Sequence, residues 1–242
     1  MIRFPSIPGG TTMLYLLAAS GPALVLLLYI YRKDGAEKEP GGLLMKLFIG
    51  GVLAAAAAAL LETGAEYVQY LILGNRHSYN WYAIMDAVMV GFIEEGTKFW
   101  FLKKFSWKER AFNYRFDGIV YAVFVSLGFA AIENVLYVFN YGTIDVMVNR
   151  AILTVPAHMS FAVYMGLFYS YAKLFDRRGD RSGRRLNLYA AYLSAALLHA
   201  FFDGTLLVDM EYSIVVFYVF VILLDIMVFR MVRSASRNDR PI

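Results

Sequence analysis

The chain has 242 residues, of which 60% are hydrophobic and 17% charged, and its formal net charge is +4. Soluble domains are nearer ~45–50% apolar and ~25% charged, so this composition excludes a soluble globular domain and predicts that a bilayer surrounds most of the chain. The sequence has no cysteine, which excludes disulfides, thiolate catalysis and cysteine metal ligands, and so modest a charge gives no reason to expect nucleic-acid binding.

Seven stretches are long and apolar enough to cross a bilayer, which takes roughly 20 residues per helix. They cover residues 13–31, 43–73, 81–102, 116–139, 151–174, 186–208 and 212–229. The first runs into Arg32 and Lys33 without a small-residue cleavage site, which indicates a retained helix rather than a signal peptide. We therefore expect one all-α, polytopic transmembrane helical bundle of about seven spans, forming a single integral membrane domain over residues 1–242.

The loop charges predict the orientation of these spans. Most of the 23 Lys and Arg residues lie in or beside the first, third and fifth connections and in the C-terminal tail. Because cytoplasmic loops carry the excess of Lys and Arg, the N-terminus is expected outside and the C-terminus in the cytoplasm. The predicted location is the cell membrane, with multiple passes.

Four consecutive spans carry ionisable side chains, which cost about 2.5–3.5 kcal/mol each to insert and are therefore functional candidates. They are Glu94, Glu95 and Lys98 in the third span, Glu133 beside Asn134 in the fourth, His158 with Arg150 at the outer end of the fifth, and His199 with Asp203 in the sixth. At ~1.5 Å per residue, the acidic residues and the histidines fall in one slab between the midplane and the outer face. This shared depth predicts one common site.

Spacing along each helix indicates which of these side chains can meet. Glu94 and Lys98 are four residues apart and can pair on one face. Glu95 lies about 100° round the helix from Glu94, so we expect the two glutamates to point in different directions. His199 and Asp203 are also four apart, so both can reach one centre. Pro156 is expected to bend the fifth span near His158.

Histidine and carboxylate donors together suit Zn²⁺, which binds His nitrogen and Asp or Glu oxygen in roughly tetrahedral sites. A catalytic zinc site keeps one position for water and lowers the pKa of that water toward ~7. A nearby carboxylate can then act as general base. The residue types therefore predict hydrolysis.

The motifs resemble those of the PrsW family of intramembrane metalloproteases, within the wider clan of CAAX-type prenyl endopeptidases. The matching patterns are Glu94-Glu95-x-x-Lys98, Phe129-x-x-x-Glu133-Asn134, Arg150 and Gly166 each eight residues from His158, and His199-x-x-x-Asp203. They occur in order on successive spans, and the resemblance covers roughly residues 80–208, the expected catalytic core. It implies peptide-bond hydrolysis in single-span membrane proteins near the extracytoplasmic face, such as the first cut in an anti-sigma factor.

The resemblance also implies roles for individual residues. Glu94 and Glu95 match the glutamate pair associated with activity, and His158 and His199 match metal ligands. We predict that these histidines hold Zn²⁺, with Glu133 or Asp203 as further ligands. One of the two glutamates is the expected base, and Lys98 with the other tunes it. Asn134 and Arg150 are expected to support the site or contact the substrate.

Three alternatives remain at this point. CAAX-type relatives can be interpreted as metal-free enzymes, in which a glutamate and a histidine activate water while a second histidine and an asparagine support an oxyanion. A proton- or ion-coupled transporter also buries Glu, Asp and His, although the inverted repeats and broken helices typical of carriers are not evident. A non-catalytic scaffold would use the same residues as structural ion pairs.

Other charged residues have simpler interpretations. Arg150 is an interfacial charge on the simplest interpretation, with a clamp on a site carboxylate as the alternative. Glu62, Glu66 and Asp86 lie toward the outer ends of their spans and are expected to meet water. Asp225, deep in the last span, is expected to have a structural partner.

Overall fold

The computed structural model describes residues 9–73, 78–141 and 144–242, and most of these residues are helical. The elements are α1 (Gly9–Lys33), α2 (Gly41–Leu73), α3 (Tyr79–Ser106), α4 (Asp117–Tyr141), α5 (Ile144–Asn149), the π-helical turn η1 (Arg150–Thr154), α6 (Val155–Arg177), α7 (Arg181–Leu207) and α8 (Ser213–Arg237). Extended structure in the described residues is limited to an isolated bridge between Tyr114 and Pro241. The all-α prediction is confirmed.

Six helical segments are long and apolar enough to cross a membrane within the described residues. One of them joins α5, η1 and α6 into a single segment over Asp145–Arg177. The predicted span 81–102 corresponds to α3, which has 28 residues but carries Glu94, Glu95 and Lys98 in its middle. Its composition alone therefore does not mark it as a span, yet it packs along α2 and α7 as part of the same bundle.

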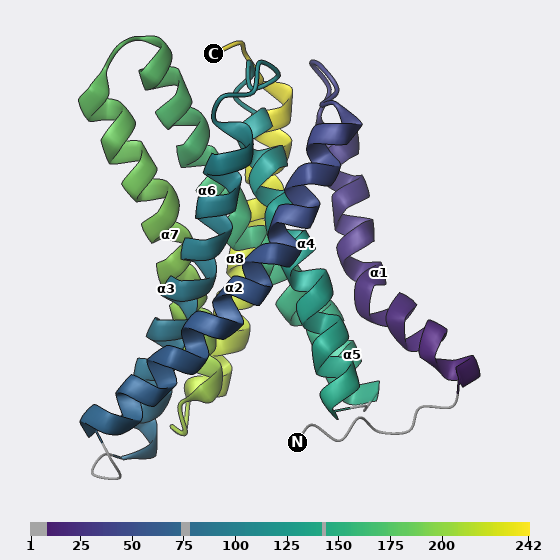
Figure 1. Ribbon diagram of the computed structural model, residues 1–242, viewed down its shortest axis with the longest axis vertical. Coiled ribbons are helices and arrows are strands. Elements are labelled where there is room, and N and C mark those ends of the chain that lie inside the picture. The colour runs from purple at the N-terminus through teal and green to yellow at the C-terminus, as the bar shows by residue number, and fades with distance from the viewer. Residues whose placement is uncertain (1–8, 74–77, 142–143) are drawn as a thin grey trace.

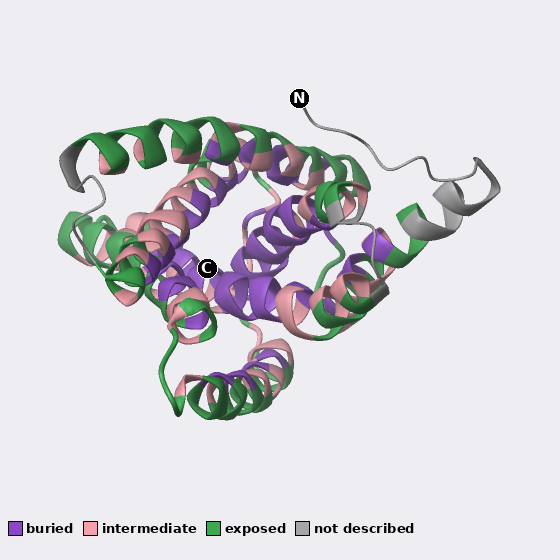
Figure 2. Cartoon of the chain, turned by 90° about the horizontal axis from the view of Figure 1, so that it is seen from below, coloured by how far each residue is buried: buried purple, intermediate pink, exposed green. Residues whose placement is uncertain are grey.

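The centre of the bundle is formed by α4 and α6, and the other long helices surround them (Figure 1). In the apolar stretch of α4, 72% of the residues are buried, against 22% in α8. Seen along the bundle, buried residues gather around the central helices while the outer faces of α2 and α8 are exposed (Figure 2). The apolar side chains on these outer faces suit contact with lipid. A membrane helix needs such side chains wherever no other helix covers it.

Small residues let α2 and α4 approach each other closely. A Cβ atom added to Gly51 of α2 would lie 1.9 Å from the Val125 carbonyl oxygen, and one added to Gly128 of α4 would lie 2.2 Å from that of Phe48. The two backbones are therefore in direct contact, as is usual where glycine and alanine line helix interfaces in membranes. The neighbouring residues Ala54 and Ala58 continue this contact toward the middle of α2.

We expect Gly51→Ala to destabilise the protein by about 1–3 kcal/mol, because the added methyl group must push two backbones apart. The midpoint of thermal unfolding in detergent measures this loss. Gly64→Ala is the matched control, since nothing lies within 4 Å of a Cβ atom at that position of the same helix. Equal midpoints for the two variants would contradict the close α2–α4 contact.

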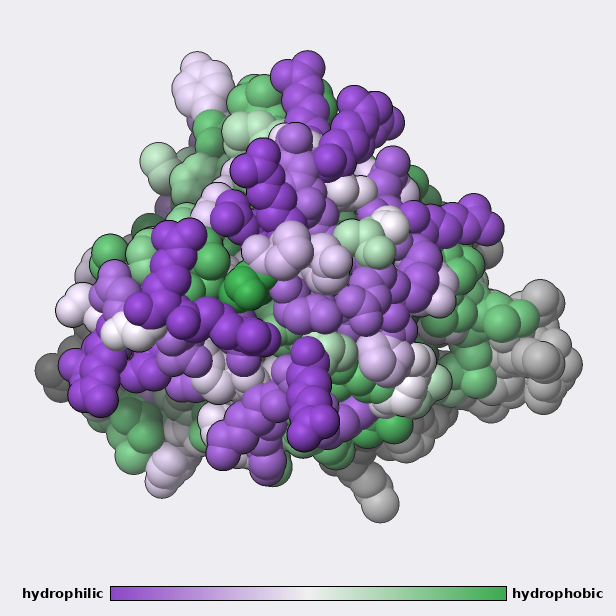
Figure 3. Space-filling model, turned by 90° about the horizontal axis from the view of Figure 1, so that it is seen from above, coloured by the Kyte–Doolittle hydropathy of each residue, from purple (hydrophilic) through white to green (hydrophobic). Residues whose placement is uncertain are grey.

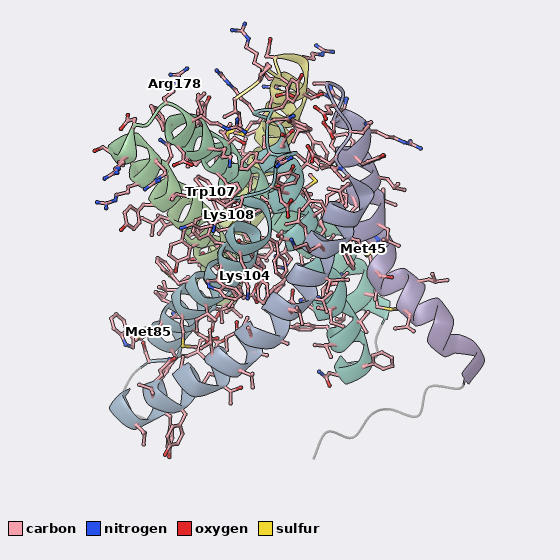
Figure 4. The ribbon with its side chains drawn as sticks, turned by 45° about the horizontal axis from the view of Figure 1, so that its top comes forward. Met45, Met85, Lys104, Trp107, Lys108 and Arg178 are labelled. Atoms are coloured by element: carbon pink, nitrogen blue, oxygen red, sulfur yellow. The ribbon has the colours of Figure 1, made fainter. Side chains whose placement is uncertain are left out.

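The two ends of the bundle differ in charge. The α1–α2, α3–α4 and α6–α7 connections and the C-terminus lie at one end (Figure 1), and hydrophilic side chains cover that end (Figure 3). Lys104, Lys108 and Arg178 lie toward it, whereas Met85 of α3 lies toward the opposite end (Figure 4). We call the first the basic end. By the positive-inside rule it is the proposed cytoplasmic end.

Candidate active site

The middle of α3 carries three ionisable side chains, and the bundle buries all of them. Glu95 is fully buried, and Lys98 and Glu94 are nearly so. The Lys98 Nζ atom donates to Glu95 Oε1 at 2.7 Å and to Glu94 Oε2 at 3.1 Å. The expectation that the two glutamates point in different directions is therefore wrong for their carboxylates. Their long side chains bend toward one ammonium group from positions three and four residues before it.

The two histidines reach this group from α6 and α7. His158 Nδ1 lies 3.1 Å from Lys98 Nζ, and His199 Nδ1 lies 3.0 Å from Glu95 Oε1. Both rings are buried, and their centroids are 5.5 Å apart. Each histidine thus directs its Nδ1 atom toward α3. His158 and His199 lie far from α3 in the sequence, and the fold alone brings them to it.

Glu94, Glu95, His158 and His199 each offer one ligand atom, and these four atoms all lie within 4.8 Å of one another. The Glu95 Oε2 atom is buried and has no hydrogen-bond partner among the described residues. Two imidazoles and two carboxylates form the kind of donor set that Zn²⁺ binds tetrahedrally. The residues therefore fit a metal ion, and in this structure Lys98 supplies the positive charge between them.

Glu133 and Asp203 lie behind the histidines, at the ring nitrogens that face away from α3. His158 Nε2 is 3.0 Å from Glu133 Oε2, and His199 Nε2 is 3.4 Å from Asp203 Oδ2. A carboxylate in this position fixes the tautomer and the orientation of a ligand histidine. Neither carboxylate belongs to the group of four donors found in the described residues, so direct metal binding by Glu133 or Asp203 stays a prediction.

Arg150 and Asn134 hold Glu133 in turn. Arg150 Nη2 pairs with Glu133 Oε2 at 2.9 Å, and its Nε atom donates to Asn134 Oδ1 at 2.7 Å. Asn134 Nδ2 donates to the Ala19 carbonyl of α1 at 3.2 Å. Arg150 is therefore more than an interfacial charge: it clamps a carboxylate that touches His158. Asn134 connects α1, α4 and η1.

The π-helical turn η1 gives Arg150 its position. The Val155 N–H donates to the Arg150 carbonyl, five residues earlier, in place of the usual four. Pro156 follows directly and has no N–H to donate to the preceding turn, so the regular α pattern is interrupted. Close to His158, where the sequence predicts a bend, the structure has a wide turn between α5 and α6.

Aromatic rings enclose the charged groups. The Phe129 centroid lies 3.9 Å from Lys98 Nζ, and the Phe161 ring stacks on His199 with centroids 5.0 Å apart. Both rings are buried. They exclude water from two sides, which strengthens the electrostatic interactions among the ionised groups.

The remaining acidic residues have different surroundings. Asp225 of α8 accepts a hydrogen bond from Ser160 of α6 at 3.0 Å, so its expected structural partner is confirmed. Glu66 and Asp86 line a cavity of about 370 Å³ between α2, α3 and α7.

Glu62 differs from these residues, because its charge interacts with those of Glu133, Lys98 and His199. Sequence reasoning assigned Glu62 to water. Its spacing of four from Ala58 is the signal that could have indicated the bundle interior.

Comparison with known proteins identifies the family to which this chain belongs. A model described as the PrsW family of intramembrane metalloproteases matches residues 39–229. A protein named protease PrsW from Clostridioides difficile is 35% identical over 214 residues, covering 87% of this chain and 86% of that protein. Proteins of the same name from Halalkalibacterium halodurans and Bacillus subtilis are each 30% identical, over 226 and 186 residues.

The matches to these relatives cover most of this chain and most of each relative. The match to the Halalkalibacterium halodurans protein covers 93% of this chain and 98% of that protein, and the match to the Bacillus subtilis protein covers 77% and 79%. No solved structure matches the chain. The chain belongs to the PrsW family of intramembrane metalloproteases and is a multi-pass hydrolase of the cell membrane that cleaves membrane proteins within the bilayer.

Proposed function

We propose that this protease hydrolyses a peptide bond of a single-span membrane protein near the extracytoplasmic face, with Zn²⁺ and a glutamate acting on the attacking water. The observation that carries the proposal is the set of four donor atoms within 4.8 Å of one another inside the bundle. The first cut in an anti-sigma factor is the proposed cellular role, which the family resemblance implies. The chain is proposed to act as one domain, with its catalytic core at about residues 80–208.

Helix positions support the proposed side of the membrane. Glu133 and His199 lie in about the last third of α4 and α7, and both helices run away from the basic end. If the basic end is cytoplasmic, the donor group lies between the middle of the membrane and its outer face. A substrate bond in the outer part of a span would reach it most directly.

Zn²⁺ would be held by His158 and His199, with a carboxylate from the Glu94–Glu95 pair, Glu133 or Asp203 completing its ligands. Bound there, the metal would supply a Lewis acid and lower the pKa of a water molecule toward ~7. The Glu95 Oε2 atom, which has no partner in the described residues, favours α3 as the source of the carboxylate ligand or the base.

The chain's own residues then have distinct tasks. One glutamate of the α3 pair takes the proton from the attacking water and delivers it to the leaving amine. Lys98 offsets the negative charge of the two carboxylates. Glu133 and Asp203 hold the histidine rings through Nε2, and Arg150 holds Glu133. Phe129 and Phe161 keep bulk water away from the reacting groups.

A metal-independent glutamate mechanism is the second candidate, and one observation favours it. Lys98 Nζ contacts Glu94, Glu95 and His158, which is the position a cation between these donors would take. In that mechanism a glutamate and His158 activate water directly, and His199, whose ring Asp203 holds at Nε2, supports the developing oxyanion.

The first experiment uses the protein reconstituted in liposomes with Zn²⁺ and a fluorogenic single-span reporter peptide whose helix is interrupted by glycines near its outer end. We expect cleavage near that interruption, about one Zn²⁺ per chain by elemental mass spectrometry, loss of cleavage with 1,10-phenanthroline, and recovery when Zn²⁺ is restored. The glycines are needed because an intact helix keeps its peptide carbonyls hydrogen-bonded.

The control reporter has an uninterrupted span and should be cut far more slowly. Full cleavage by protein that holds no metal would replace the zinc mechanism by the metal-independent one. A complete lack of cleavage by zinc-loaded protein, with both reporters, would contradict the proposed peptidase site.

A further inference from the structure

Glu62 is carried on a face of α2 that turns toward the charged group of α3. Ala54 and Ala58, which precede it at intervals of four residues, are buried against Phe129 of α4. The Phe129 ring lies against Lys98 Nζ. Because residues four apart share one face of a helix, Glu62 is one turn beyond this layer and faces the same interior.

The surroundings of Glu62 agree with this position. Its charge interacts with those of Glu133 on α4, Lys98 on α3 and His199 on α7. A fifth helix therefore contributes an acidic group to the neighbourhood of the four donors. None of the sequence motifs contains Glu62, and α2 precedes the expected catalytic core.

One carboxylate oxygen of Glu62 has no structural task. Its Oε1 atom is buried and has no hydrogen-bond donor in the part of the chain that the structure describes. The residue as a whole is only partly buried, so it lies at the edge of the interior, where a rotation of the side chain would present this oxygen to a bound molecule. An unpaired carboxylate inside a membrane protein is costly and usually functional. Its chemistry calls for a hydrogen-bond donor.

An intramembrane substrate brings such donors. Cleavage requires that the substrate helix unwinds, which releases backbone N–H groups that find no water in the bilayer. We propose that Glu62 is a substrate-binding residue whose Oε1 atom accepts a backbone N–H of the unwound segment beside the scissile bond. This inference rests on the proposed peptidase function, and it adds a contact on α2 to a site otherwise built from α3, α4, α6 and α7.

Two substitutions separate the acceptor from the charge. Glu62→Leu removes every acceptor at similar size, whereas Glu62→Gln keeps a carbonyl oxygen. We expect kcat/KM for the glycine-interrupted reporter in liposomes to fall about ten- to hundredfold in Glu62→Leu, the range of a hydrogen bond to a charged group, mainly through a higher KM. Glu62→Gln should lose less than about tenfold. Glu66→Leu and Glu66→Gln, one turn away on an exposed position, are the matched controls and should cleave normally.

Reporter binding by the inactive Glu95→Gln protein gives a readout that needs no cleavage. With a fluorescent reporter in the same liposomes, adding Glu62→Leu should weaken binding by about the factor seen in KM. If the wild-type protein did not cleave, the peptidase function would fail, and this binding measurement would still decide the role of Glu62.

Three results would overturn the inference. Glu62→Leu could bind and cleave within twofold of the wild type, which would mean that the oxygen contacts only water. Glu62→Gln could lose as much kcat as Glu62→Leu with KM unchanged, which would indicate a proton carrier. The thermal unfolding midpoint could fall in both Glu62 variants together with binding, which would indicate a structural role.

Discussion

Replacing Glu95 by glutamine is expected to lower cleavage of the reporter by at least about a hundredfold, because general base catalysis contributes 10²–10⁴. Glu95 is fully buried and accepts hydrogen bonds from Lys98 and His199 through Oε1, which leaves Oε2 without a partner. The amide of glutamine has nearly the same shape but carries no charge and takes no proton. The loss should therefore appear in kcat.

Glu94→Gln is the natural comparison, because its carboxylate also contacts Lys98 but lies farther from His199, at 3.8 Å. We expect a smaller loss in this variant if Glu95 is the base. Glu66→Gln controls for removal of a carboxylate elsewhere. The protein should remain folded in each case, which the thermal unfolding midpoint checks. Cleavage by Glu95→Gln within tenfold of the wild type would refute its role.

The second large effect is expected for His158→Ala, which should abolish both metal binding and cleavage. His158 is one of two imidazoles among the four donors, and its ring also connects Lys98 to Glu133. Elemental mass spectrometry of the purified variant measures the metal, and the reporter assay measures cleavage. His199→Ala should behave in the same way.

Glu133→Gln and Asp203→Asn test which carboxylates bind the metal. If they only orient the histidines, metal affinity should fall about 10–100-fold while saturating Zn²⁺ restores occupancy. If they are ligands, as the sequence also predicts, the metal should be lost as it is in His158→Ala.

For His158→Ala itself, full metal retention with normal cleavage would contradict both arrangements. Cleavage lost without any change in bound metal would favour a metal-free role for His158.

Much of the fold follows from local sequence. The observed helices begin and end within a few residues of most predicted spans, because a bilayer requires about 20 apolar residues and satisfied backbone hydrogen bonds wherever a chain crosses it. The candidate residues were also evident from the sequence, since ionisable side chains inside apolar segments are rare and costly. Among the long helices of the described residues, only α3 deviates from the pattern of an apolar span, and it is the helix that carries the glutamate pair.

The contacts within the site were decided by tertiary structure. Periodicity separated Glu94 from Glu95, and a place toward the outer end of its span assigned Glu62 to water. The bundle instead brings both α3 carboxylates to Lys98 and turns Glu62 toward the same group. Local spacing determines which residues share a face of one helix, and it says nothing of how far neighbouring helices approach or rotate. Close contacts through Gly51 and Gly128 set that geometry for α2 and α4, so which donors meet depends on packing between residues far apart in the chain.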